Sequence, residues 1–190
     1  MRPEILKREI AHTGYLTVER LRVRLPDGAE VWREVERHGN AVAVLPYDVE
    51  RCCALIVRQF RAPVLDAAGE EALEEACAGM ILDEDDETAV RREAYEELGL
   101  VLGPLEFVVR IWPSPGVSTE RQSLFLARYR AADRVGPGGG VEDEHEGITV
   151  VERSLADLAG DLDAGYITDG KLVTLVLALR LRRPELFVRD

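Results

Sequence analysis

Residues 79–100 read GMILDEDDETAVRREAYEELGL, the most informative stretch of the sequence. It predicts a glycine loop, then a short helix, then a glycine that ends the helix. Glu93, Glu96 and Glu97 are spaced i, i+3 and i+4, so they share one face of that helix within about one turn. Three carboxylates that close repel one another, and their oxygens suit a hard divalent cation such as Mg2+. The pattern therefore indicates an enzyme that uses a metal ion to act on phosphate.

The same stretch resembles the Nudix box, whose family pattern is G-x5-E-x7-R-E-U-x-E-E-x-G-U, where U is a bulky apolar residue. Residues 92–100 fit the second half of the pattern, and Glu84 lies at the expected distance before Arg92. The spacing from Gly79 to Glu84 is one residue shorter than in the family. The resemblance implies an α/β protein: a Nudix-type α/β/α sandwich with a mixed sheet, plus a small N-terminal antiparallel β segment.

Roles for individual residues follow from this resemblance. It implies that Glu93, Glu96, Glu97 and the backbone carbonyl of Ala78 bind Mg2+ or Mn2+, that Glu97 is also catalytic, and that Arg92 orients a glutamate. Apart from the family, a divalent ion neutralises diphosphate oxygens and lowers the pKa of a bound water. The alternative is a solvated helix on which Arg92 and Glu96 form an ordinary i,i+4 ion pair.

The acidic run at residues 142–146 is the second feature that carries chemistry. On charge alone it reads as an exposed, solubilising turn. It follows the glycines of residues 136–140, which predict a flexible hinge, so the alternative is a lid over the site. The stretch resembles a loop of Nudix hydrolases of nucleoside diphosphate sugars. That resemblance favours Glu144 as the catalytic base and Glu146 as a metal-linked residue. Glu142 and Glu146 remain alternatives for the base, and His145 could act as a base by its chemistry.

Three further residues are candidate substrate contacts. Glu120 ends a Pro-Ser-Pro-Gly segment that resembles one in the same family branch, although the segment alone predicts only a turn. Arg61 follows a buried strand, where its guanidinium suits phosphate oxygens or, equally, a surface ion pair. Arg33 lies in a Trp-Arg-Glu-Val segment that resembles one holding the base in related dimers. The alternative is that Arg33 is an ordinary side chain on one face of a strand, with no role in binding.

Composition limits the class of protein. The 190 residues suit one domain with a small appendage. The net charge of −12 argues against nucleic acid or an anionic membrane as the main partner. The odd count of three cysteines does not suit a secreted disulfide framework. No stretch reads as a signal peptide or membrane span, so a cytoplasmic protein is expected.

Periodicity and turn residues predict the remaining elements. We expect a hairpin over residues 15–37, strands near 41–45, 54–57, 105–112, 123–129 and 148–151, and a turn at 46–48. Asp85 or Asp86 caps the first helix, which buries Val90, Ala94 and Leu98. A second helix runs from Ser154 to Gly165, and a third covers 171–183. These elements predict a mixed sheet with helices on both faces.

The chain is therefore expected to divide into an N-terminal β segment, residues 1–38, and a Nudix hydrolase domain, residues 39–190. The closest likeness is to the GDP-mannose hydrolase branch, beside the ADP-ribose pyrophosphatases. It implies Mg2+-dependent hydrolysis of a nucleoside diphosphate sugar by a homodimer whose N-terminal strands reach the partner. The alternatives are a non-catalytic nucleotide-sugar sensor, which has little need of three repelling carboxylates, and an enzyme acting on triphosphates.

Overall fold

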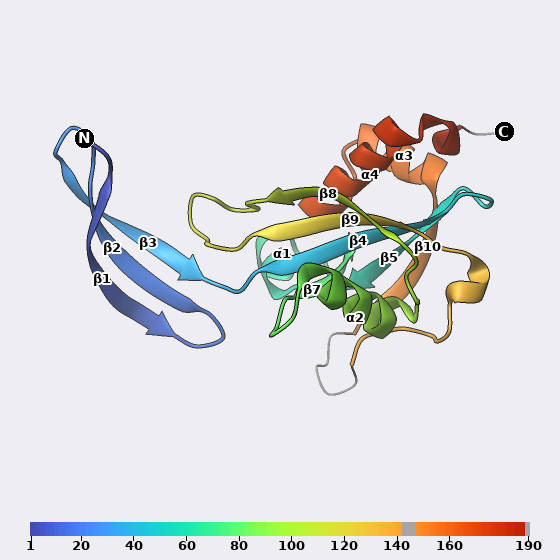
Figure 1. The fold of residues 1–190 in the computed structure, drawn as a ribbon, viewed down its shortest axis with the longest axis horizontal. Coiled ribbons are helices and arrows are strands. Elements are labelled where there is room, and N and C mark those ends of the chain that lie inside the picture. Colours follow the sequence, from blue (N-terminus) through green and yellow to red (C-terminus); the bar gives the residue numbers. More distant parts are fainter. Residues whose placement is uncertain (142–146, 189–190) are drawn as a thin grey trace. The chain divides into compact units, whose positions relative to one another are not determined.

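The computed structural model describes residues 1–141 and 147–188, and the chain forms two compact units (Figure 1). The N-terminal unit contains Met1–Asn40 and Ile111–Gln122. The main unit contains Ala41–Arg110 and Ser123–Asp190. Within the described residues, no helix is long and apolar enough to cross a membrane.

The N-terminal unit is built on a three-stranded antiparallel sheet. Its strands are β1 (Glu4–Thr13), β2 (Thr17–Arg24) and β3 (Glu30–Arg37), with β2 in the middle. The hairpin predicted over residues 15–37 is confirmed as β2 and β3, whereas β1 was not foreseen. The 111–122 segment joins this unit by main-chain bonds from Glu36 N to Val117 O (2.8 Å) and from Thr119 N to Glu36 O (3.1 Å).

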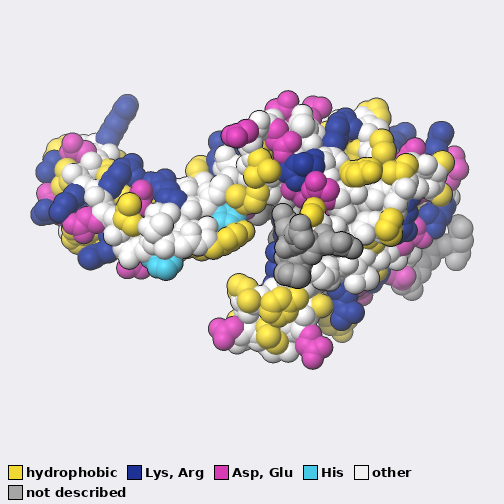
Figure 2. All heavy atoms as spheres, turned by 90° about the horizontal axis from the view of Figure 1, so that it is seen from below, with side chains coloured by type: hydrophobic (Ala, Val, Ile, Leu, Met, Phe, Trp, Pro, Cys, Tyr) yellow, Lys and Arg dark blue, Asp and Glu magenta, His cyan; other side chains and the backbone are white. Residues whose placement is uncertain are grey.

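Opposite charges alternate on this small sheet. Figure 2 shows basic and acidic side chains interspersed over the unit. The ion pairs include Arg24 with both Glu4 (2.8 Å) and Glu30 (3.2 Å), and Arg37 with Glu19 (2.9 Å). Leu21 is a buried residue at the centre of the sheet. These exposed pairs contribute little stability each, because water screens them.

The main unit contains a seven-stranded mixed sheet. Its strands run in the order β10 (Thr149–Ser154), β5 (Cys53–Gln59), β4 (Ala41–Asp48), β9 (Gln122–Arg128) and β8 (Leu105–Ile111). Two short strands extend it: β6 (Leu73–Glu75) pairs with β5, and β7 (Cys77–Met80) pairs with β4. The five predicted strands of this unit are confirmed.

Two local predictions in this sheet were wrong. Residues 46–48 are not a turn, because β4 continues to Asp48 and is buried along its whole length. The turn comes next, where the Asp48 carboxylate accepts hydrogen bonds from the amides of Glu50 (2.9 Å) and Arg51 (3.1 Å). The glycine loop predicted before the box helix is also absent, because Gly79 lies in β7, opposite Val42.

Helices cover both faces of the sheet, as predicted. In Figure 1, α2 (Asp86–Leu98) lies on one side, and α3 (Leu155–Asp163) and α4 (Gly170–Arg182) lie on the other. Short 3-10 turns occupy Ala131–Asp133 (η1) and Pro184–Phe187 (η3). The α/β/α sandwich is confirmed. The helix α1 (Ala62–Ala68) was not predicted, since it is short and buries none of its residues.

The helix ends match the predicted caps. The Asp85 carboxylate accepts a hydrogen bond from Thr88 N, and Gly99 ends α2 in the left-handed conformation at φ 63°. The Ser154 hydroxyl caps α3 by accepting from Asp157 N, and the Asp169 carboxylate caps α4. Asp85, rather than Asp86, is thus the cap of the box helix.

The core lies between α2 and the sheet. The predicted stripe of Val90, Ala94 and Leu98 is fully buried and packs with Val42 and Leu55 in one cluster. Fully burying an aliphatic side chain of this size is worth about 1.5–3 kcal/mol. This packing fixes the rotation of α2, so Glu93, Glu96 and Glu97 have defined positions.

Candidate functional site

The site begins with the close contact between α2 and β7. The Glu93 carboxylate lies directly over the backbone of Gly79, where an added Cβ would stand 1.9 Å from its Oε1. Glu97 is only 3% exposed and accepts a hydrogen bond from Ala78 N through Oε2 (3.1 Å). Two carboxylates thus converge on consecutive residues of one strand. Gly79 is required for this approach and not for a turn.

Arg92 binds the carboxylates that surround it. Its Nη1 lies 2.8 Å from Glu93 Oε1 and 3.0 Å from Glu96 Oε2. Its Nε and Nη2 both donate to Glu84 Oε1 (3.0 and 2.8 Å), and Nη2 also donates to the carbonyl of Met80 (3.0 Å). The guanidinium therefore ties the start of the box to the helix that carries the acidic face.

Arg92 stays protonated and positively charged among these carboxylates. Partial burial acts to lower its pKa, but the hydrogen bond to Glu84 and the charge of Glu93 outweigh that effect and raise the pKa. A permanent cation thus offsets the repulsion between carboxylates that share one helical turn.

The alternative of a solvated helix face does not describe this arrangement. The Arg92–Glu96 ion pair that it predicts is present. However, Glu97 is buried, and only 12% of the Glu93 side-chain surface is exposed. Carboxylates are rarely taken out of water without a partner that requires them there.

The donor set fits a divalent metal ion. Oxygens of Glu93 and Glu96 both lie within 3.0 Å of one nitrogen of Arg92, so these side chains already hold a positive charge between them. Glu97 adds a third carboxylate beside Ala78. Within the described part of the chain, no three acidic, histidine or cysteine side chains are already arranged as a complete metal site. Any metal ion bound here would share Glu93 and Glu96 with Arg92.

Arg61 takes part in a network of charged side chains with Glu75, Lys171 and Asp169. Its Nε and Nη2 contact the two oxygens of Glu75 (2.6 and 3.1 Å). Glu75 is 2% exposed and also binds Lys171 Nζ (3.0 Å), which binds Asp169 (2.8 Å). Burial alone raises the pKa of Glu75, but Arg61 and Lys171 together lower it, so the carboxylate stays charged.

The sequence did not predict this network. Glu75 and Lys171 are separated by 96 residues, and their pairing depends on how α4 packs against the strands. The available signal was Asp169-Gly170-Lys171, a capping residue followed by one of only two lysines in the chain.

Arg33 and Glu120 belong to the N-terminal unit. Arg33 is exposed on β3 and donates through Nη1 to the carbonyl of Trp32 (2.9 Å). Glu120 accepts a hydrogen bond from Gln122 Nε2 (3.0 Å), and its amide donates to Ser118 Oγ (3.1 Å). Glu142, Glu144, His145 and Glu146 lie outside the described residues, so their roles stay predictions.

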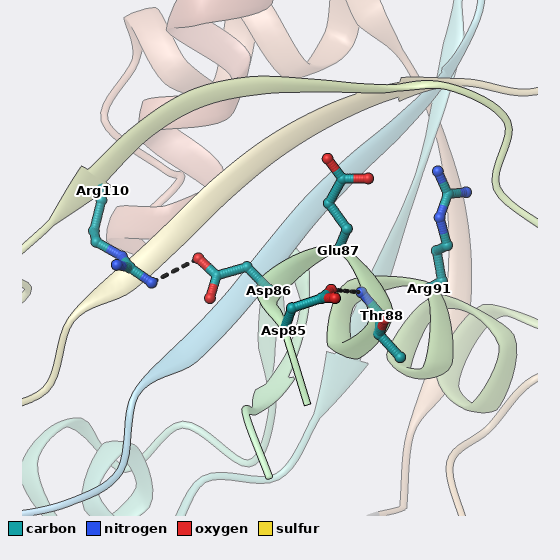
Figure 3. Close-up of a pocket in the computed structure, with 6 residues that line it drawn as sticks. All are labelled: Asp85, Asp86, Glu87, Thr88, Arg91 and Arg110. Atoms are coloured by element: carbon teal, nitrogen blue, oxygen red, sulfur yellow. Dashed lines mark hydrogen bonds and ion pairs between the residues drawn. The ribbon is translucent and has the colours of Figure 1, made fainter. Parts of the chain in front are cut away.

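The other end of α2 borders an open depression of about 580 Å³ (Figure 3). It is lined by Asp85, Asp86, Glu87, Thr88, Arg91 and Arg110. Arg110 donates to Asp86 (2.6 Å), and Arg91 donates to the carbonyls of Leu102 and Gly103. The two basic groups of this depression are thus already bonded to the protein.

Comparison with known proteins places the chain in a family. The NUDIX domain pattern matches residues 37–173, and the chain belongs to the Nudix hydrolase family. Enzymes of this family generally need divalent metal ions, in agreement with the carboxylates gathered on α2.

The proteins that resemble this chain are named for particular activities within the Nudix family. A GDP-mannose pyrophosphatase from Cronobacter sakazakii is 38% identical over 94% of this chain and 95% of its own length. One from Escherichia coli is 32% identical over 93% of this chain and 94% of its own. A solved structure titled as an ADP compounds hydrolase superposes with a TM-score of 0.77, covers 99% of this chain and 98% of its own, and is 21% identical. That structure shows the fold alone.

Proposed function

We propose that this chain hydrolyses the pyrophosphate bond of a nucleoside diphosphate sugar, either GDP-mannose or ADP-ribose, to a nucleoside monophosphate and a sugar phosphate. The observation that carries the proposal is the convergence of Glu93 and Glu97 on Ala78 and Gly79. The name shared by the relatives supports the substrate class, since they match over nearly the whole chain.

Mg2+ or Mn2+ is the proposed cofactor, held by Glu93, Glu96, Glu97 and the Ala78 carbonyl. When bound, such an ion neutralises diphosphate oxygens and makes a coordinated water more acidic. Arg92 contributes by fixing the orientation of Glu93 and Glu96, as its short contacts to both indicate. Residues that orient metal ligands commonly affect metal affinity or activity by about 10- to 100-fold.

Glu144 is the proposed base that takes the proton from the attacking water, and Glu146 is proposed to act beside the metal. Arg61 is the proposed phosphate contact, because the two-point contact with Glu75 holds its guanidinium in one orientation. Arg33 and Glu120 are proposed to contact the base and the sugar.

We also propose a homodimer formed through residues 1–38. The N-terminal sheet leaves Ile5 47% exposed, Ile10 70% exposed and Trp32 38% exposed, apolar surface that a partner chain could cover. A cytoplasmic location is proposed from the three free cysteines, two of them buried. Equilibrium ultracentrifugation of the whole chain and of a variant lacking residues 1–38 tests the dimer.

A substrate panel tests the activity. GDP-mannose, ADP-ribose, other nucleotide sugars and nucleoside triphosphates are incubated with Mg2+ or Mn2+, and the nucleoside monophosphate is measured by chromatography. We expect turnover of GDP-mannose or ADP-ribose that chelation abolishes. Binding of a nucleotide sugar without turnover would favour a non-catalytic nucleotide-sugar sensor. Preferential hydrolysis of triphosphates would show that the substrates are nucleoside triphosphates and not nucleoside diphosphate sugars.

A further inference from the structure

Residues 135–140, predicted to be a flexible hinge, run along the C-terminal end of α2 and are held there by main-chain bonds. The amides of Val135 and Gly136 donate to the carbonyl of Gly99 (2.8 and 3.2 Å). The amide of Gly139 donates to Glu97 O (2.8 Å), and that of Gly140 donates to Glu96 O (3.1 Å). This segment is therefore hydrogen-bonded to the C-terminal end of α2.

These bonds complete the end of the helix. The last carbonyls of an α-helix have no partner within the helix. In α2, Leu100 N bonds Ala94 O (3.1 Å) and Gly99 N bonds Tyr95 O (3.0 Å), as in a glycine-terminated helix. The next two carbonyls, those of Glu96 and Glu97, receive their donors from the glycines. The side chains of these two residues are among the proposed metal ligands.

The approach of the two segments is possible only with glycine. An added Cβ at Gly138 would lie 2.3 Å from Glu97 O and 2.7 Å from Leu98 C. An added Cβ at Gly99 would lie 2.3 Å from Gly136 O. Both glycines also have positive φ, 70° and 63°. Any side chain at Gly138 would thus push against the backbone of Glu97 itself.

Glu97 is consequently held at both ends. Its carboxylate accepts from Ala78 N in β7, and its carbonyl accepts from Gly139 N. Its Cα is fixed by the buried neighbours Ala94 and Leu98. A shift of the glycines against the helix end therefore moves the backbone from which the carboxylate reaches β7.

We infer that Gly138, Gly139 and Gly140, the glycine clamp, are positioning residues that set the metal affinity of the site through the carbonyls of Glu96 and Glu97. This inference rests on the proposed metal-binding role of those glutamates. The clamp touches neither metal nor substrate. It acts because misplacing a reacting or binding group by about 1 Å can cost on the order of 100-fold.

The test compares three glycine-to-alanine variants. Gly138→Ala places a Cβ against Glu97. Gly136→Ala is the control within the same segment, since its Cβ would meet nothing nearer than Gly99 Cα at 3.8 Å. Gly165→Ala is the control for backbone strain, because Gly165 has φ 77° and nothing within 4 Å of an added Cβ.

Mn2+ binding to each whole-chain variant is measured by electron paramagnetic resonance, with melting temperature alongside. We expect at least tenfold weaker Mn2+ binding in Gly138→Ala. We expect wild-type Mn2+ affinity in Gly136→Ala and Gly165→Ala. Wild-type Mn2+ affinity in a folded Gly138→Ala would overturn the inference. If the wild-type protein itself binds no Mn2+, the proposed metal-dependent function is refuted whatever the variants do. Failure of the proposed function can thus be told apart from failure of the glycine-clamp inference.

Hydrogen exchange on the wild-type protein keeps the inference testable if Gly138→Ala does not fold. Mg2+ should slow exchange of the Gly139 and Gly140 amides by up to about 100-fold at 100 times its dissociation constant. The Gly69 amide, which donates to Leu65 O in α1, should not change. Equal exchange of the clamp amides with and without bound Mg2+ would show that clamp and site are uncoupled.

Discussion

Substituting alanine for Gly79 should disable the site while preserving the fold. The new Cβ would stand 1.9 Å from Glu93 Oε1 and 2.0 Å from Glu93 Cδ. Real contacts of this kind are essentially never shorter than 3.0 Å, so the Glu93 carboxylate has to move by about 1 Å or more. Gly79 has no positive φ, so alanine introduces no backbone strain of its own. The effect is confined to the contact with Glu93.

A displacement of this size should reduce turnover by on the order of 100-fold. Crowding of this kind costs about 1–3 kcal/mol of folding stability, which a domain of this size tolerates. The assay is nucleotide-sugar hydrolysis at saturating substrate over a Mn2+ titration, together with the melting temperature. Gly116→Ala is the matched control, because nothing lies within 4 Å of a Cβ at that exposed glycine.

A second substitution tests whether crowding of the Glu93 carboxylate causes the loss of turnover in Gly79→Ala. Adding Glu93→Asp to Gly79→Ala shortens the crowded side chain by one methylene, so part of the lost Mn2+ affinity should return. Wild-type turnover in a folded Gly79→Ala would refute the reasoning, since it would mean that the Glu93 carboxylate is not needed where it lies.

Three further predictions follow from the same geometry. Glu97→Gln keeps the shape of a buried side chain that accepts from Ala78 N, so turnover should fall by several orders of magnitude while circular dichroism stays unchanged; full activity would contradict the ligand role. Glu144→Gln should lower kcat with little change in KM, and an unaltered kcat would place the base elsewhere. Because Arg61 and Lys171 lower the pKa of Glu75, its charge stabilises the folded state above its ordinary pKa of 4.5, and this stabilisation is lost as the pH falls through the lower folded-state pKa. The melting temperature of the wild type should therefore exceed that of Glu75→Gln at neutral pH, and the gap should narrow progressively as the pH falls below 4.5; a gap independent of pH would show that the charge of Glu75 does not matter.

The parts of the fold that the sequence predicted are those set by local chemistry. The limits of α2 follow from Asp85 and Gly99, a capping side chain and a residue tolerant of positive φ. Its buried side follows from the spacing of Val90, Ala94 and Leu98. The continuous apolar runs of β4 and β5 likewise predict strands with two covered faces.

The parts that were missed depend on contacts between distant segments. Gly79 reads as a loop residue, because only the Glu93 side chain, brought over it by α2, explains a glycine inside a strand. The glycines of residues 136–140 read as a hinge for the same reason, since their hydrogen-bond acceptors lie about 40 residues earlier in the chain. The helix α1 was missed for a different reason. The sequence does carry a local signal for it, Pro63 at its start and Gly69 at its end, but the helix buries none of its residues and so shows no apolar periodicity.

For the candidate site, the sequence identified the carboxylates correctly as one face of a helix but not their partners. It assigned Arg92 to support one glutamate, whereas Arg92 contacts Glu84, Glu93 and Glu96 together. It assigned the carbonyl of Ala78 as a ligand, and the structure adds the Ala78 amide as the donor to Glu97.

The guanidinium of Arg92 gives the newly made chain an internal counter-ion. Because its charge already lies between the acidic side chains, the polypeptide can reach its final packing without first capturing a divalent ion. A divalent ion, when bound, then joins Arg92 as a second positive partner of these carboxylates. Removing the metal with a chelator should accordingly leave the chain folded, in contrast to zinc-dependent domains that unfold when stripped.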